Sequence, residues 1–221
     1  SEFKENVLSL IKNSDVGINN VISEKIDINE SSFFPKDMPQ ELIDIVKKQL
    51  KKDEELITFR AIHKKNCKNG AFEEIQFDLE DESEGTQKLF LLSGPVIDSL
   101  DKGKVLIIDE IEGRLHTLLT RQLISLFNSP ETNPNHAQLI FATHDTNLLS
   151  NKLLRRDQIW FVEKDEDSAS HLYSLSELKV RNDRSYENDY LEGLYGGIPL
   201  LGEMRQMVID ISKEEDHEEK L

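Results

Sequence analysis

Residues 104–116 read KVLIIDEIEGRLH, and this stretch decides the fold. Its apolar run, KVLIID, has the length and the lack of alternation that are typical of a strand buried on both faces of a parallel sheet. The run ends in Asp109-Glu110. In α/β proteins, side chains at the carboxyl end of such a strand face the crevice where ligands bind. We therefore expect an α/β fold with a ligand site at this strand end.

A second apolar run, QLIFAT at residues 138–143, leads into His144 and Asp145. Between the two runs, residues 115–128 place their leucines and Phe127 on one stripe of a helix. A strand, a helix and a strand in this order predict a right-handed parallel crossover, so the two strand ends should be neighbours. Two further strands are expected at residues 158–163 and 171–175, on either side of an acidic turn.

Asp109, Glu110 and His144 are candidates for phosphate chemistry. An aspartate at a strand end can hold Mg²⁺, usually through water, because magnesium favours oxygen ligands and keeps part of its hydration shell. A following glutamate can polarise the water that attacks phosphorus. A histidine on the neighbouring strand end can hydrogen-bond a γ-phosphate or orient that water. Taken singly, each also has a structural reading, as an acidic strand end or as a histidine satisfied at a strand terminus.

A third segment, DLEDESEGTQKLF, precedes the first apolar strand. Ser83 is a plausible N-cap for a helix over residues 85–100, and Gly85 allows a ligand to approach the backbone closely. The free amides and the positive dipole end of that helix would suit an anion. We expect the helix to be broken or kinked near Gly94-Pro95, because proline lacks an amide donor.

The first third of the chain indicates a helix-flanked antiparallel sheet. The expected elements are a helix at 4–13, a strand at 17–28, a loop at 29–38, an amphipathic helix at 39–53, and strands at 56–63 and 71–79. The last two strands are joined by a connection that ends in Asn69-Gly70, a hairpin turn signal.

Composition limits the partners. The formal net charge of −16 argues against binding of DNA or RNA by this chain alone, because an acidic surface repels phosphates. No apolar run approaches the roughly 20 residues that cross a bilayer, so we expect no membrane partner. The single cysteine, Cys67, cannot form an internal disulfide, and a reducing, cytoplasmic setting is expected.

The three segments in this order resemble the second lobe of ABC-type ATPases of the SMC-like branch. More narrowly, they resemble bacterial AAA-type ATPases of abortive-infection (anti-phage) systems. That family also tends to show runs like DVGINNV, DQIWFVEKD (Asp157–Asp165) and the closing Tyr195–Pro199. The resemblance covers about residues 14–202 and implies an ATP-sandwich homodimer that hydrolyses ATP with Mg²⁺ and releases its partner on hydrolysis.

The resemblance also implies roles for individual residues. Asp109 would be the Walker B acid associated with magnesium, Glu110 the catalytic carboxylate, and His144 the switch histidine. The signature motif, which contacts the nucleotide of the partner protomer, would comprise Ser83, Glu84, Gly85, Thr86 and Gln87. The D-loop would comprise Arg114, Leu115 and His116.

Two departures from the family pattern are clear. Glu112-Gly113-Arg114 replaces the usual acidic-then-serine pattern before Leu115-His116, which puts the D-loop in doubt. No G-x-x-x-x-G-K-[ST] occurs, so the P-loop (Walker A) that cradles the phosphates is missing. We therefore expect the chain to be a truncated piece that lacks an N-terminal Walker A lobe, and expect this chain alone to be inactive.

The expected divisions are residues 1–80, an antiparallel portion of the ATPase head; 81–203, the lobe with signature, Walker B and switch histidine; and 204–221, a C-terminal helix and acidic tail. An alternative function is a non-catalytic module for dimerisation or for docking an effector protein. Another is an ATPase of DNA maintenance or repair. A third, a metal-dependent nuclease using Glu163 and the acidic run Asp165-Glu166-Asp167, has less support because those residues lie in an expected hairpin turn.

Overall fold

The computed structural model describes residues 2–26, 38–49, 56–67, 72–180 and 184–198. The chain divides into two compact units, residues 1–144 and 145–221, and each is described by itself. The fold is mixed α/β, with antiparallel and parallel sheets, as the sequence predicts. The expected division at residue 80 stays a prediction. The expected C-terminal helix and tail, 204–221, lie outside the described residues.

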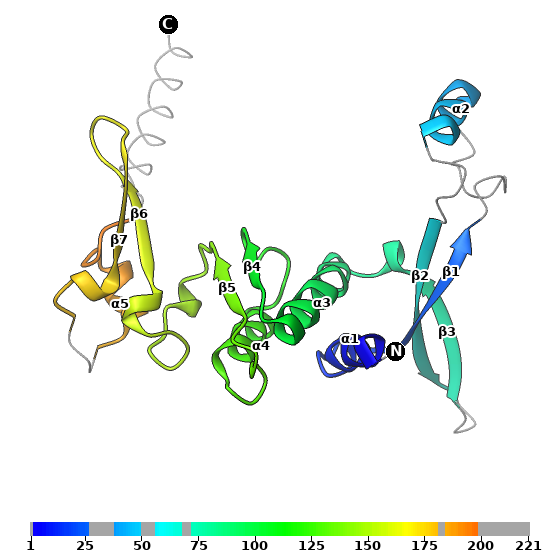
Figure 1. Cartoon of the computed structure of the whole chain (residues 1–221), viewed down its shortest axis with the longest axis horizontal. Helices are drawn as coiled ribbons and strands as arrows, with labels where there is room; N and C mark the ends of the chain where they lie inside the picture. The colour runs from blue at the N-terminus through cyan, green and yellow to red at the C-terminus, as the bar shows by residue number, and fades with distance from the viewer. Residues whose placement is uncertain (1, 27–37, 50–55, 68–71, 181–183, 199–221) are drawn as a thin grey trace, which may run out of the picture. The chain divides into compact units, whose positions relative to one another are not determined.

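The first unit begins with helix α1 (Glu2–Lys12) and a sheet of the order β1-β2-β3. The strands are β1 (Ile18–Ile26), β2 (Leu56–Asn66) and β3 (Phe72–Asp78), and both pairings are antiparallel, as predicted (Figure 1). Ile11 of α1 packs against side chains of the sheet in a small core, whose other buried members are Ile18, Val21 and Ala61. The expected Asn69-Gly70 turn and the 29–38 loop fall on residues that are not described, apart from residue 38.

Helix α2 (Gln40–Gln49) lies in the segment between β1 and β2 and confirms the expected helix. Its apolar side chains Leu42 and Ile45 are 47% and 50% exposed. No described element therefore covers this helix at these positions.

Helix α3 (Glu84–Lys102) follows a single 3-10 turn, η1 (Leu79–Asp81). Ser83 is its N-cap, as predicted, and Gly103 ends it with a left-handed φ of 63°. The helix continues through Pro95, so a break at Gly94-Pro95 is wrong, whereas a kink there stays a prediction. Buried residues on both sides of the proline, among them Leu89, Val96 and Leu100, hold the helix against the core and offset the missing hydrogen bond.

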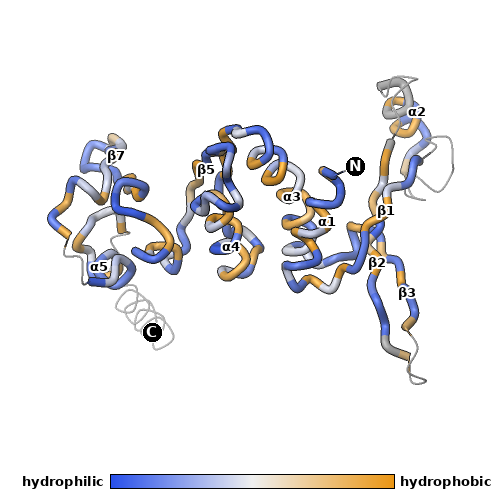
Figure 2. Tube along the Cα trace, turned by 60° about the horizontal axis from the view of Figure 1, so that its bottom comes forward, coloured by the Kyte–Doolittle hydropathy of each residue, from blue (hydrophilic) through white to orange (hydrophobic). Residues whose placement is uncertain are grey.

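Strand β4 (Val105–Ile108), helix α4 (Thr117–Asn128) and strand β5 (Gln138–Phe141) form the predicted crossover. β4 and β5 pair in parallel, with Val105 opposite Gln138 and Ile108 opposite Phe141. Helices α3 and α4 pack on one face of this pair, and Figure 2 shows hydrophobic stretches along both helices.

The expectation that β4 and β5 are buried on both faces is wrong for the described residues. On one face Val105, Ile107 and Ile140 are 54%, 73% and 54% exposed. Parallel sheets are almost always covered on both faces. The described part of the chain thus leaves an apolar sheet face open.

The second unit starts with two 3-10 turns, η2 (Thr146–Leu148) and η3 (Arg156–Gln158). The expected strands are present as the antiparallel hairpin β6 (Trp160–Lys164) and β7 (Ser170–Ser174), followed by η4 (Leu175–Glu177) and helix α5 (Tyr186–Leu191). Their shared core consists of Ile159, Phe161, Leu175, Tyr186 and Tyr195. Among the helices described in either unit, none is long and apolar enough to span a membrane.

Candidate functional site

The carboxyl ends of β4 and β5 lie side by side. The amide of Ala142 donates to the carbonyl of Ile108 at 3.1 Å, and the amide of Ile111 donates to the carbonyl of Ala142 at 3.2 Å. The ladder therefore continues past both strands and holds the Asp109-Glu110 segment against the segment that carries His144. The juxtaposition expected from the sequence is present.

Asp109 and Glu110 present free carboxylates at this edge. Both residues are exposed, and among the described residues neither side chain has a hydrogen-bond or ion-pair partner. Glu110 has a φ of 47°, an uncommon conformation for a residue with a side chain. Two unpaired carboxylates with room around them match the oxygen ligands and the water shell of Mg²⁺.

Glu112 is the carboxylate that contacts His144. Its Oε1 accepts a hydrogen bond from the His144 amide at 3.0 Å, and the same oxygen lies 3.0 Å from His144 Nδ1. The Glu112 side chain is 10% exposed, whereas that of His144 is 79% exposed. The carboxylate is thus fixed inside the fold and the imidazole projects outward.

The pKa of Glu112 reflects two opposed effects. Burial raises it, but hydrogen bonds from the Thr143 side chain and the His144 amide outweigh burial and hold the pKa below its ordinary value of 4.5. Glu112 is therefore ionised at neutral pH. Its second oxygen, Oε2, is buried and has no hydrogen-bond partner among the described residues.

The start of α3 meets the turn that follows β4. A Cβ added to Gly85 would lie 2.6 Å from the carbonyl oxygen of Arg114, so only glycine fits here. Glu84 forms an ion pair with Arg114 across the same contact. Candidate signature residues and candidate D-loop residues therefore touch within one protomer.

Several of the candidate residues have structural partners. Thr86 is buried, and its hydroxyl pairs with Ser83 Oγ at 2.8 Å. Gln87 Nε2 donates to the carbonyls of Glu80 and Glu82 at 3.1 and 2.8 Å, which ties the preceding turn to the helix.

The same holds in the expected D-loop. Leu115 is buried in the core, and His116 is the N-cap of α4, where its Nδ1 accepts from the Leu118 amide at 3.2 Å. Arg114 is exposed and has a φ of 64°. Of the candidate residues in these two segments, Glu84, Gly85 and Arg114 form the contact.

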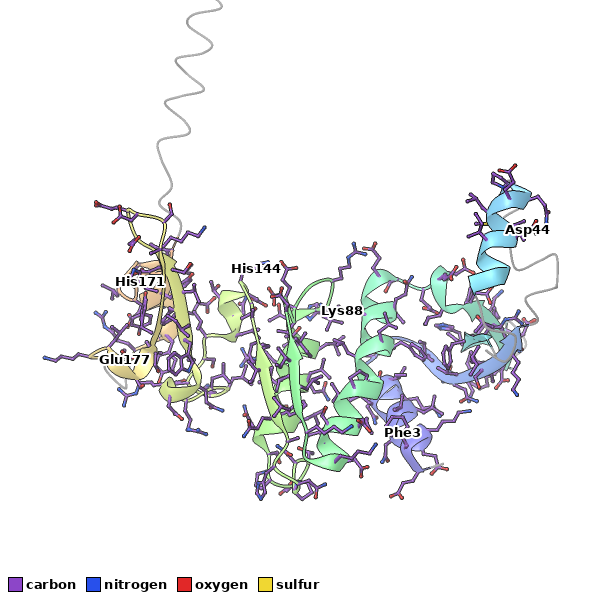
Figure 3. All side chains as sticks on the ribbon, turned by 45° about the horizontal axis from the view of Figure 1, so that its top comes forward. Phe3, Asp44, Lys88, His144, His171 and Glu177 are labelled. Carbon is purple, nitrogen blue, oxygen red and sulfur yellow. The ribbon has the colours of Figure 1, made fainter. Side chains whose placement is uncertain are left out.

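The sequence singled out neither Glu112 nor Lys88 as a site residue. Lys88 Nζ donates to the carbonyl of Glu110 at 2.7 Å and so joins α3 to the turn after β4. Figure 3 labels Lys88 on α3 and His144 beyond the end of β5. No short motif contains Lys88 and Glu110 together, because 22 positions separate them.

The second unit gives structural roles to the residues of the nuclease alternative. Asp165 Oδ1 accepts from the amides of Asp167 and Ala169 at 3.0 and 2.8 Å, which closes the β6–β7 turn. His171 lies on its other oxygen at 2.7 Å. Across the described ranges, no group of three His, Cys, Asp or Glu side chains is placed to hold a metal ion.

The closing Tyr195–Gly197 segment packs on that hairpin. Gly196 has a φ of 72°, and a Cβ there would lie 2.5 Å from both Glu163 Oε2 and Tyr173 Oη. The Gly197 amide donates to Glu163 at 2.9 Å. Burial, with a hydrogen bond to Asp189, raises the pKa of Tyr195. Two runs that the resemblance singled out, one on β6 and one at Tyr195, thus join in one structural contact.

The arrangement in the first unit offers chemical groups of the kinds that suit a cation and a phosphate. Two free carboxylates, an outward imidazole and the capped start of a helix occur in one unit. Asp109 would hold Mg²⁺, Glu110 would face water, and the α3 start would offer amides to an anion. These donors fit Mg²⁺ and a triphosphate.

Comparison with known proteins gives one family. The model described as "AAA domain, putative AbiEii toxin, Type IV TA system" matches residues 6–150. No curated protein matches the sequence. A solved structure from "Structural biochemistry of ATP-driven dimerization and DNA stimulated activation of SMC ATPases" aligns over 89% of this chain and 93% of that chain, at 14% identity with a TM-score of 0.47.

Proposed function

The chain belongs to this AAA-domain family, whose members are ATPase-type nucleotide-binding domains, and from that membership we propose that it is the ATP-hydrolysing head of an ABC-like ATPase. The observation that carries the proposal is the pairing of two parallel strand ends, one with Asp109-Glu110 and the other with His144. Parallel α/β sheets bind ligands at this edge.

Each residue then has a task. Asp109 would hold Mg²⁺ through water. Glu110 would orient and polarise the attacking water, and His144 would contact that water or the γ-phosphate. Bound ATP would supply the phosphoryl group, and Mg²⁺ would neutralise the negative charge on its phosphate oxygens. Catalysis by these side chains is positioning and charge stabilisation.

In this proposal the nucleotide cradle comes from a further lobe. The sequence contains no P-loop, and the described β4–β5 sheet has an open apolar face at Val105, Ile107 and Ile140. A lobe that carries the P-loop would cover this face and complete the site. We place this lobe in the same natural protein.

The working form in this proposal is a homodimer with ATP between its protomers. The α3 start, with Ser83 and Gly85, would contact the nucleotide held by the partner, because its free amides and dipole favour the γ-phosphate. The Glu84–Arg114 ion pair would link that contact to the turn after β4 in the same protomer. A bacterial anti-phage role, through a toxin–antitoxin pair or another effector protein, is the biology that the family description favours.

The test is Mg²⁺-dependent ATP hydrolysis by the natural full-length protein. Glu110→Gln should abolish hydrolysis and keep ATP-dependent dimerisation, measured by light scattering. Glu131→Gln, an exposed carboxylate after α4, is the matched control and should behave as wild type. Hydrolysis that persists in Glu110→Gln would remove Glu110 from the catalytic role.

A second candidate function is a docking module without catalysis. The open face of β4–β5 and the exposed Leu42 and Ile45 of α2 favour it, because such apolar surfaces mark binding sites. This reading predicts a defined complex with an effector protein in the absence of nucleotide, detected by size-exclusion chromatography. The same measurement separates the two candidates, since the ATPase requires nucleotide for its dimer. DNA maintenance or repair remains an alternative biology for the same ATPase.

A further inference from the structure

We propose that Glu112 is a positioning residue for His144, which it holds with the Nδ1–H edge turned inward so that Nε2 of the neutral ring accepts a hydrogen bond from the attacking water. The inference rests on the proposed function, because it assigns a task to His144 within that site. It adds a residue outside the expected set of Asp109, Glu110 and His144.

The first step is the double contact on one oxygen. Glu112 Oε1 receives the His144 amide at 3.0 Å and lies 3.0 Å from His144 Nδ1. Both the backbone amide and the ring of His144 therefore contact the same oxygen atom. Rotation of the ring away from this position breaks the second contact, so the carboxylate limits the orientations of an otherwise exposed side chain.

The second step is the identity of the proton. An ionised carboxylate has only acceptor oxygens. A neutral imidazole carries its proton on one nitrogen, and the other nitrogen accepts. A ring whose Nδ1 lies on the carboxylate therefore carries the proton on Nδ1. In that neutral tautomer Nε2 is an acceptor, which can hold an O–H of water but cannot donate to a phosphate oxygen.

The third step is the burial of Glu112. Its side chain is 10% exposed against 79% for His144, so the anchor lies inside and the anchored group outside. The Oε2 atom is buried without a hydrogen-bond partner among the described residues. Leaving such an oxygen unpaired costs free energy.

The fourth step is the turn that holds Glu112. Ile111 is fully buried and its amide donates to Ala142 at 3.2 Å, which fixes the turn to β5. The Gly113 amide donates to the Glu110 carbonyl at 3.0 Å, and Lys88 Nζ donates to the same carbonyl at 2.7 Å. Glu110 and Glu112 therefore differ in their surroundings, since the first is exposed and unpaired and the second is largely shielded from solvent and contacts His144.

The kinetic test is a double-mutant cycle in the natural full-length protein. Glu112→Gln keeps the side-chain volume and removes the charge, and we expect kcat to fall about 10- to 100-fold with little change in KM, as for other partners that orient a catalytic group. His144→Gln should lower kcat further. The double variant should equal His144→Gln alone, because Glu112 acts through the histidine. Independent, multiplying losses would overturn the proposal.

The second test does not require ATP. Ring-nitrogen NMR of this chain at a pH of about 9, where an ordinary histidine is neutral, distinguishes the two tautomers. We expect His144 to carry its proton on Nδ1 in the wild type, and we expect Glu112→Gln to shift it toward the tautomer mixture of the exposed His136 in the same spectrum. Glu131→Gln should leave His144 unchanged.

The two tests separate the inference from the function on which it rests. A wild-type His144 that carries its proton on Nε2 contradicts the positioning role whether or not the protein hydrolyses ATP, and this result needs no variant to fold. Hydrolysis that depends on Glu110, together with an additive cycle at Glu112 and His144, would leave the ATPase standing and remove Glu112. Absence of hydrolysis with the expected tautomer would remove the ATPase and the catalytic task of His144, and would leave only the structural contact between Glu112 and His144.

Discussion

At the scale of single residues, Glu112 predicts how stability depends on pH. Its pKa in the folded chain lies below the ordinary value of 4.5, because the hydrogen bonds from Thr143 and His144 outweigh burial. The unfolded chain therefore binds the proton more readily, and the stabilisation is present above pH 4.5 and is lost as the pH falls through the folded pKa. Urea unfolding from pH 7 to pH 3 should show a smaller loss of stability for Glu112→Gln than for wild type. Equal slopes would show that the carboxylate titrates normally.

The sequence indicated part of the site at this scale. Asp109, Glu110 and His144 could be predicted because they directly follow apolar strands, and Ser83 because it precedes a helix. Glu112 and Lys88 could not be predicted in the same way. The contacts of these two side chains depend on a turn in which Glu110 and Arg114 both have positive φ. The residue types do not predict that conformation.

At the scale of elements, the start of α3 predicts a contrast between its two glycines. Gly85→Ala would place a methyl group 2.6 Å from the Arg114 carbonyl, and we expect a loss of about 1–3 kcal/mol in the free energy of unfolding from overpacking. At Gly94 a methyl group meets no atom within 4 Å, so Gly94→Ala should change stability by less than about 1 kcal/mol. Chemical denaturation measures both. Equal effects would show that α3 does not meet the turn as described.

The order and type of the elements could largely be predicted from periodicity and turn signals. The parallel crossover and the β6–β7 hairpin are both present where the patterns place them. The predicted break in α3 is absent because the packing of Leu89, Val96 and Leu100 outweighs the local preference of Gly94-Pro95 against a helix. Propensity acts on one turn, whereas burial acts along the whole helix.

At the scale of the whole molecule, the proposed P-loop lobe predicts a difference between this chain and a longer protein that carries that lobe. Ile107 is 73% exposed here, so Ile107→Asn should change the stability of this chain by less than about 0.5 kcal/mol. In that longer protein a covering lobe would bury the same side chain, and the amide would cost about 1–3 kcal/mol. Denaturation curves of Ile107→Asn in both proteins, each compared with its wild type, measure the two effects. A neutral effect in both proteins would mean that nothing covers this face.

The apolar run of β4 predicted burial on both faces, and only one face is buried by described residues. An apolar strand of this composition is compatible with a face covered by its own unit and with a face covered by another lobe. Periodicity therefore could not say which element covers the second face.

The central claim is that Asp109, Glu110 and His144 form half of an ATPase site. The most direct measurement is the steady-state kcat for Mg²⁺-dependent ATP hydrolysis by the natural full-length protein and its Glu110→Gln variant. The account predicts turnover in the wild type and a loss of about 100- to 10,000-fold in the variant, as for removal of a group that handles the attacking nucleophile. Equal rates in the two proteins, or no Mg²⁺-dependent turnover in the wild type, would contradict it.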